Sequence, residues 1–232
     1  MISITDFTTI SIINLPKRTD RLREISDQLN KIGLTFESPN VNLFSAIRPA
    51  NRGGFDSIGA HGCFLSHLQV LRNAQKSDNL MILEDDLDFV PGIDELLKSA
   101  LKNLPKDWGI FYGGCAVDLP LTLNPIQRVS CSDDVRCSYF VAFNGPVIPV
   151  LIDYLSAILQ RPPGHQDGGP MHVDGAYACF RIDNPNIFVY AARPELGVQR
   201  PSRTDIHLLK WFDRIPFVRD FVQLVRRHRA AK

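Results

Sequence analysis

Four carboxylates gather within five consecutive positions of the 232-residue sequence, directly after the apolar run Leu80–Leu83. They are Glu84, Asp85, Asp86 and Asp88. Two carboxylates ~4 Å apart repel each other by on the order of 4 kcal/mol at an effective dielectric constant near 20. A divalent cation relieves this repulsion, and oxygen ligands favour Mg²⁺ or Mn²⁺, usually together with substrate phosphates. The four acids therefore predict a Mn²⁺ or Mg²⁺ site. The alternative is a solvated acidic turn that precedes a helix.

Apolar runs of strand length alternate with segments of helical periodicity, which predicts an α/β fold. The runs 9–15 and 80–83 are nearly continuous, as in parallel strands buried on both faces. Ligands of open α/β sheets bind beyond the carboxyl ends of the strands, where the acidic residues lie. We expect loops at 38–58 and 161–170, an irregular segment at 113–137, strands at 9–15, 34–36, 80–83, 108–112, 139–143 and 187–190, and helices at 19–32, 59–74, 93–101, 146–159 and 174–180.

The composition excludes several classes of protein. Lysine and arginine total 26 against 25 aspartates and glutamates, a formal charge of +1, which argues against a dedicated nucleic-acid binder. No run of about 18 apolar residues is present to span a membrane. The amino terminus lacks the basic segment of a secretory signal. Five scattered cysteines without a CxxC pair favour free thiols and a reducing, cytoplasmic location.

Three segments resemble glycosyltransferase family 25 in the same order: INLPKRTDRL at 13–22, GAHGCFLSHLQVL at 59–71 and LMILEDD at 80–86. HVDGAY at 172–177 and PELGVQRPSRTDI at 194–206 match more loosely. The resemblance implies a GT-A-like fold with a mostly parallel, Rossmann-like sheet flanked by helices. It also implies a divalent metal and inverting transfer of a hexose, from UDP-galactose or UDP-glucose, to a saccharide acceptor. Such a transfer belongs to the assembly of lipopolysaccharide or another surface glycan.

The resemblance and the predicted sheet edge together suggest contacts to the nucleotide sugar. Arg18 and Arg21 follow the first strand and would bind phosphate or ribose oxygens, unless they only form a solvated helical turn. Backbone groups of Asn14 and Leu15 would line the base or ribose pocket. The adjacent Ser66 and His67 point about 100° apart on a helix, so they do not form a nucleophilic pair. They would contact the nucleotide, or the histidine would pack between helices, and Cys63 would be a small core residue.

Inverting transfer needs a carboxylate that takes the proton of the acceptor hydroxyl. Asp174 is the candidate, although an aspartate at a helix start also suits an N-cap. Weaker rivals are Asp153, Asp167 and Asp205. Late in the chain, His172 and His207 are candidate metal ligands. Contacts to donor or acceptor are expected from His172, Gln199, Ser202, Asp205 and His207.

We expect one catalytic domain at 1–205, with a nucleotide-sugar half at 1–115 and an acceptor half at 116–205. In residues 206–232, apolar residues recur at three- and four-residue steps among basic residues, as in a basic amphipathic helix. This tail would dock on the domain or on the inner face of the cytoplasmic membrane, where a lipid-linked acceptor would lie.

Two other functions compete with the transferase. The sequence Asp86-Leu87-Asp88 after an apolar strand imitates the nucleophile motif of haloacid dehalogenase-type phosphatases. In those enzymes, however, the motif strand normally comes first in the chain. The second alternative is an inactive domain that binds the nucleotide sugar and the metal without catalysing transfer.

Overall fold

The computed structural model describes residues 3–120 and 122–200. In this part of the chain, seven strands form one sheet in the order β2-β1-β3-β7-β5-β8-β6. The strands are β1 (Thr9–Asn14), β2 (Val41–Ser45), β3 (Asn79–Glu84), β5 (Trp108–Ala116), β6 (Ile126–Val129), β7 (Arg136–Asn144) and β8 (Phe188–Ala192). A separate two-stranded ribbon pairs β4 (Leu87–Phe89) with β9 (Gly197–Gln199). The helices are η1 (Ile4–Asp6), α1 (Thr19–Asn30), α2 (Ile58–Asn73), α3 (Ile93–Asn103), α4 (Val147–Gln160) and α5 (Val173–Asp183).

Most strands of the sheet point the same way. The pairs β1–β2, β1–β3 and β5–β8 are parallel, whereas β7 is antiparallel to both of its neighbours, β3 and β5. The edge strand β6 is antiparallel to β8. Thus β1, β2, β3, β5 and β8 share one direction, and β6 and β7 take the other. This arrangement confirms the predicted α/β fold with a mostly parallel central sheet flanked by helices.

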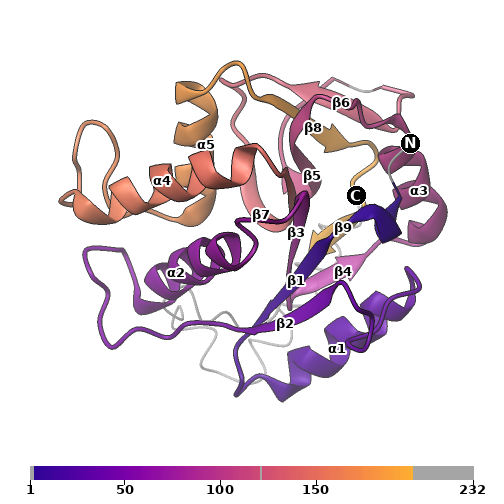
Figure 1. Ribbon diagram of the computed structural model, residues 1–232, viewed down its shortest axis with the longest axis horizontal. Helices are drawn as coiled ribbons and strands as arrows, with labels where there is room; N and C mark the ends of the chain where they lie inside the picture. Colours follow the sequence, from indigo (N-terminus) through magenta and orange to yellow (C-terminus); the bar gives the residue numbers. More distant parts are fainter. Residues whose placement is uncertain (1–2, 121, 201–232) are drawn as a thin grey trace, which may run out of the picture.

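The alternation of side chains along the central strands builds one core on each face of the sheet. In β3, Leu80 and Ile82 belong to one buried cluster, and Met81 and Leu83 belong to the other. The first cluster contains apolar residues of α2, α4 and α5, and the second contains those of α1 and α3. Figure 1 shows the same layers, with α2, α4 and α5 on one side of the sheet and α1 and α3 on the other.

The carboxyl ends of β1, β2 and β3 meet at one edge of the sheet. Ile13 is in register with Glu84, and Asn14 is in register with Ser45. Helix α2 begins beside this edge, where the Ser57 side chain caps it by accepting a hydrogen bond from the backbone N–H of Ala60. A Cβ atom on Gly62 would lie 2.4 Å from the carbonyl oxygen of Ile47, so only glycine lets the helix approach the segment that follows β2.

Several predicted boundaries were wrong. Residues 34–36 form no strand and lead into a turn over 35–38, and the second strand is β2, inside the predicted loop 38–58. Thr35 and Ser38 close that turn through backbone and side-chain hydrogen bonds. Strand β2 lies at an edge and is largely exposed, so its sequence VNLFS lacks the apolar run of a central strand. The segment 113–137, predicted to be irregular, contains the end of β5, all of β6 and the start of β7.

The end of β5 was not predicted because two glycines interrupt its apolar run. A Cβ atom on Gly113 would lie 2.3 Å from the Phe140 ring, and one on Gly114 would lie 2.4 Å from the Tyr139 ring. The glycines leave room for these two aromatic rings from the neighbouring strand β7. The short β4 and β9 were also unpredicted, because each has only three residues.

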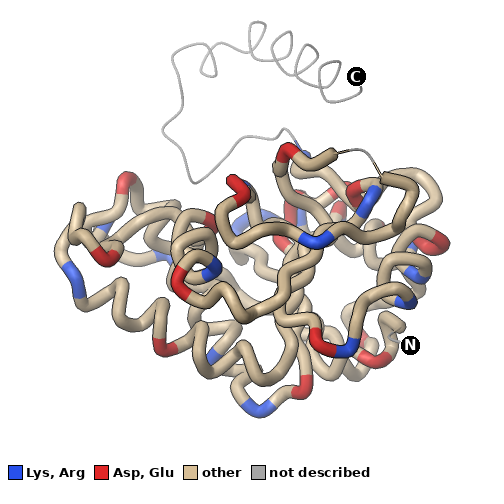
Figure 2. Tube along the Cα trace, turned by 90° about the horizontal axis from the view of Figure 1, so that it is seen from above, with Lys and Arg blue, Asp and Glu red and all other residues tan. Residues whose placement is uncertain are grey.

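The sheet runs without a break across the predicted division between 1–115 and 116–205, since β7 lies between β3 and β5. That division stays a prediction, and the predicted tail at 206–232 lies outside the described residues. Within residues 3–120 and 122–200, none of the helices combines the length and the apolar character needed to cross a membrane. Figure 2 shows basic and acidic residues interspersed along the described trace.

Candidate functional site

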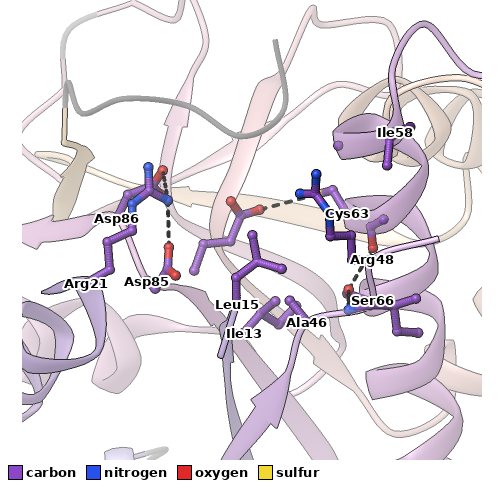
Figure 3. A pocket seen from close by; sticks show the side chains of 14 residues that line it. Ile13, Leu15, Arg21, Ala46, Arg48, Ile58, Cys63, Ser66, Asp85 and Asp86 are labelled. Carbon is purple, nitrogen blue, oxygen red and sulfur yellow. Dashed lines mark hydrogen bonds and ion pairs between the residues drawn. The ribbon is translucent and has the colours of Figure 1, made fainter. Parts of the chain in front are cut away.

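A cavity of about 650 Å³ opens at the shared edge of β1, β2 and β3. Figure 3 shows Arg21, Asp85 and Asp86 on one side of the cavity and Arg48, Cys63 and Ser66 on the other. The lining residues come from the end of β1, the segment after β2, the first turns of α2 and the acidic motif: Ile13, Leu15, Arg21, Ala46, Ile47, Arg48, Ile58, Gly59, Gly62, Cys63, Ser66, Glu84, Asp85 and Asp86.

Asp85 is the fully paired carboxylate of the motif. Its Oδ1 accepts a hydrogen bond from Nη1 of Arg21 at 2.8 Å, and its Oδ2 accepts one from Nδ2 of Asn14 at 2.7 Å. Its backbone N–H donates to the carbonyl oxygen of Ile13. Because both carboxylate oxygens are occupied and the residue is only 6% exposed, Asp85 fixes the motif to β1 and α1. The side chains of Asn14 and Arg21 therefore hold the acidic motif, and the predicted contacts of the Asn14 backbone and of Arg21 with the nucleotide stay predictions.

Asp86 is the incompletely paired carboxylate. Its Oδ2 lies 3.3 Å from Nη1 of Arg21 and 3.3 Å from Nε2 of Gln199. Its Oδ1 is buried without a hydrogen-bond partner among the described residues. Burial and the negative charge of Glu84 raise the pKa of the Asp86 carboxyl to about 7. A buried, unpartnered carboxylate oxygen beside a second carboxylate is an arrangement that a cation would stabilise.

Glu84 continues the face of β3 that packs against α2, because it follows Leu80 and Ile82 at two-residue steps. Its Oε1 lies 3.1 Å from Nε2 of His67, whose Nδ1 lies 2.9 Å from the Tyr177 hydroxyl. His67 is 0% exposed and does not line the cavity. Sequence reasoning allowed a nucleotide contact or a packing histidine, and the structure places it as the buried support of Glu84.

Asp88 lies apart from the other acids, on the β4–β9 ribbon. Both of its carboxylate oxygens accept hydrogen bonds from Nε of Arg200 at 3.1 Å, and its Oδ1 also accepts one from Nε2 of Gln28 at 3.2 Å. It lines neither this cavity nor the one described next. The two paired oxygens make Asp88 a link between the ribbon and α1 rather than a ligand directed at Asp86.

A second cavity of about 500 Å³ adjoins the first and shares Cys63 and Glu84 with it. Asp174, His172 and Gln199 line it. Asp174 Oδ2 accepts a hydrogen bond from the backbone N–H of Cys137 at 3.0 Å. His172, rather than Asp174, is the N-cap of α5. The predicted base, the late glutamine and the acidic motif therefore border one space.

The remaining predicted residues differ in where they lie relative to the two cavities. Ser66 accepts a hydrogen bond from the backbone N–H of Ile47 and donates one to the carbonyl of Gly62, so its hydroxyl joins α2 to the segment after β2. Leu15 lines the first cavity as predicted. Arg18 lines neither cavity and pairs with Asp20, whose pKa it holds well below the usual range. Asp153 and Asp167 also line neither cavity, and Ser202, Asp205 and His207 lie outside the described residues.

Sequence reasoning missed three residues that shape this region. Arg48 lines the first cavity, Tyr177 supports His67, and Arg200 binds Asp88 and Glu24. Arg48 lay in a segment interpreted as a loop, and a basic residue in a loop carries no spacing signal. Tyr177 falls within HVDGAY, and Arg200 is part of the loosely matching segment 194–206, so both were in view without an assigned role.

Comparison with known proteins matches the first part of the chain to a family model. The model of "Glycosyltransferase family 25 (LPS biosynthesis protein)" matches residues 7–119. Among solved structures, a glycosyltransferase involved in the glycosylation of the major capsid of PBCV-1 is 14% identical, with 78% of this chain and 91% of that chain covered and a TM-score of 0.37. The mannose-1-phosphate geranyltransferase from Thermus thermophilus is 12% identical, with 78% and 58% covered and a TM-score of 0.36. At such TM-scores neither likeness defines the fold. A search of curated proteins found no match.

Proposed function

We propose, from the match of residues 7–119 to the model of glycosyltransferase family 25, that the chain is a glycosyltransferase that transfers a hexose from a nucleotide sugar to a saccharide hydroxyl with inversion. Lipopolysaccharide or a related surface glycan is the product class that the family description supports. The donor proposed is UDP-galactose or UDP-glucose, bound in the first cavity. The acceptor hydroxyl would enter the second cavity, which adjoins the first at Glu84 and Cys63.

The buried, unpartnered Oδ1 of Asp86 is the observation that carries this proposal. A carboxylate oxygen without a donor is costly in the interior unless a proton or a cation accompanies it. Asp86 and Glu84 offer hard oxygen ligands at the cavity wall, which fits Mg²⁺ or Mn²⁺. Asp85 is committed to Arg21 and Asn14, so we assign the metal to Asp86 with Glu84. The bound cation would neutralise charge on the diphosphate leaving group.

Cationic and backbone groups around the first cavity would bind the diphosphate. Arg48 lines the wall opposite Asp86, and Arg21 lines the same side as Asp86. The first turn of α2, with Ile58 and Gly59, borders the cavity as well. Backbone N–H groups at a helix start suit phosphate oxygens, and the arginines add charge-assisted hydrogen bonds.

Asp174 would act as the general base. Its carboxylate is oriented by the backbone N–H groups of Cys137 and Gly175, at 3.0 and 2.9 Å. In the proposed step, the acceptor oxygen forms a bond to the anomeric carbon while the bond from that carbon to the diphosphate breaks. The hydroxyl proton passes to Asp174. Such proton transfer typically contributes about 10²–10⁴-fold to the rate.

The phosphatase alternative receives no support from the placement of Asp88. A nucleophile motif of that kind needs both aspartates at one site, but Asp88 pairs with Arg200 and Gln28 and lines neither cavity. An inactive binding domain differs from the transferase only in turnover, so the assay below separates them.

Incubation of the purified chain with a panel of nucleotide sugars and Mn²⁺ tests the proposal. We expect slow release of UDP from UDP-galactose or UDP-glucose, faster with a saccharide acceptor and abolished by a chelator. Uridine nucleotides with Mn²⁺ should also raise the melting temperature by mass action. A stabilised chain without turnover would indicate the inactive binder, and phosphate release from simple phosphomonoesters would indicate the phosphatase. No thermal shift with any uridine nucleotide would contradict the donor assignment.

The site of action is proposed from the family description and the basic tail. A lipid-linked acceptor at the inner face of the cytoplasmic membrane would suit a chain with a basic amphipathic segment at 206–232. Cosedimentation with anionic vesicles, compared between the full chain and a variant with neutral residues at Arg226, Arg227 and Arg229, measures this contact.

A further inference from the structure

Side chains of three types that can bind metals lie close together where the two cavities adjoin. Cys63 and His67 lie four residues apart on α2, so they share one face of the helix, and Glu84 ends β3 opposite them. The Sγ of Cys63, the Nε2 of His67 and the Oε1 of Glu84 all lie within 4.8 Å of one another. This set differs from the acidic pair of the proposed function, because it joins a thiol and an imidazole to the carboxylate.

The separations suit a small tetrahedral cation. Nε2 of His67 is 3.1 Å from Oε1 of Glu84, and Sγ of Cys63 is 4.0 Å from the same oxygen. Zinc bonds of about 2.0–2.3 Å at tetrahedral angles place ligand atoms about 3.3–3.6 Å apart. A shift of the cysteine side chain by on the order of 1 Å would complete such a set.

The second ring nitrogen of His67 already has the kind of partner that orients a metal-binding histidine. Its Nδ1 lies 2.9 Å from the Tyr177 hydroxyl, and the tyrosine is itself buried in the core. A ligating histidine almost always has its second ring nitrogen fixed by such a partner. Cys63 and Glu84 both line the two cavities, so an ion can reach them from solvent and a further coordination position faces open space.

We propose that Cys63, His67 and Glu84 form a second divalent-cation site, selective for zinc over magnesium because thiolate and imidazole are softer ligands than carboxylate. Binding releases the Cys63 thiol proton to solvent. His67 then keeps its proton on Nδ1, where it donates to the Tyr177 oxygen. Glu84 serves both this site and the proposed Asp86 site. Zinc is therefore expected to compete with Mg²⁺ or Mn²⁺, a consequence that rests on the proposed function, whereas zinc binding itself does not.

Titration of the metal-free full chain with Co²⁺, a coloured substitute for zinc, tests the site without any activity measurement. We expect one equivalent to produce a thiolate-to-cobalt charge-transfer band, which stoichiometric Zn²⁺ removes. Cys63→Ser should lose the band, while Cys137→Ser and Cys179→Ser should keep it. Tyr177→Phe should weaken Co²⁺ affinity roughly 10–100-fold.

Protection of the unmodified chain provides a second readout that needs no variant. Zn²⁺, but not Mg²⁺, should slow alkylation of Cys63 by iodoacetamide, followed by mass spectrometry of the labelled peptides. Absence of the charge-transfer band, its persistence in Cys63→Ser, or equal alkylation with and without Zn²⁺ would overturn the proposal. None of these outcomes depends on sugar transfer, so failure here leaves the test of the proposed function intact.

Discussion

Two neighbouring aspartates of the acidic motif, Asp85 and Asp86, differ in how completely their carboxylates are paired. Asp85 has both carboxylate oxygens bonded, to Arg21 and to Asn14. Asp86, on the same side of the cavity, keeps one buried oxygen without a partner among the described residues, whereas Glu84 contacts His67 on α2. Adjacent residues of one motif thus have different tasks. Asp85 anchors the motif to β1 and α1, and Asp86 keeps a carboxylate oxygen for a ligand.

The strongest test of this comparison removes the charge of Asp86. Asp86→Asn keeps the shape of the side chain but deletes the proposed metal ligand. We expect kcat/KM for sugar transfer to fall by about 10³-fold, because stabilisation of the leaving group is lost. Steady-state release of the nucleoside diphosphate measures it. A loss of less than about tenfold would place the metal elsewhere.

The next change separates the acceptor side from the donor side. Asp174→Asn removes the proposed base but leaves the first cavity intact, so kcat should fall by about 10²-fold. Affinity for the nucleotide, measured by calorimetry with Mn²⁺ and UDP, should change by less than about twofold. Asp153→Asn on α4 is the matched control, because that residue lines neither cavity. Equal kcat values for Asp174→Asn and the native chain would exclude Asp174 as the base.

The anchoring role of Asp85 predicts a loss of stability instead of a purely catalytic loss. Arg21→Gln leaves Asp85 buried without its cationic partner, and breaking such a pair costs about 3 kcal/mol. Urea denaturation should show this decrease in the free energy of unfolding. Lys98→Gln is the control, since its pair with Asp94 is exposed. Unchanged stability of Arg21→Gln would mean that Asp85 does not anchor the motif.

The raised pKa of Asp86 predicts a pH-dependent difference between the native chain and Asp86→Asn. Burial raises this pKa from 3.8 to about 7, so the folded chain holds the proton to higher pH than the unfolded chain does. The contribution of Asp86 to stability is therefore present below about pH 4 and is lost as the pH rises toward 7. In metal-free buffer, the free energy of unfolding of Asp86→Asn should match that of the native chain near pH 4 and exceed it by about 4 kcal/mol at pH 8. Urea midpoints across this range measure the difference, and a constant gap would contradict the burial of a charged Asp86.

The sequence predicted the segments of the fold that have a strong hydrophobic pattern. The apolar runs around Ile12 and Ile82 marked two central strands, and the stripe of α3 marked its inward face. The acidic motif at a strand end located the first cavity, because strand direction alone places Glu84 and Asp86 at that edge. These features depend on residues close together in the chain.

Features that depend on distant partners could not be predicted in the same way. Nothing near Asp85 in the sequence indicates that Asn14 and Arg21, more than 60 positions earlier, occupy its two oxygens. Asp88 lies two residues after Asp86, a spacing that suggests a shared metal, yet Arg200 at the other end of the described chain pairs with it. The sequence shows that the acidic residues are close together in the chain. Contacts with residues far away in the sequence decide which carboxylate oxygen remains available for a ligand.

Binding of Mn²⁺, followed by electron paramagnetic resonance of the free ion in the presence of UDP, tests the central claim most directly. The account predicts one Mn²⁺ per native chain, at least tenfold weaker binding in Asp86→Asn, and nearly native binding in Asp88→Asn, whose side chain is bonded to Arg200 and Gln28. Native affinity in Asp86→Asn, or loss of binding in Asp88→Asn alone, would contradict the assignment of the unpartnered Asp86 oxygen to a cation.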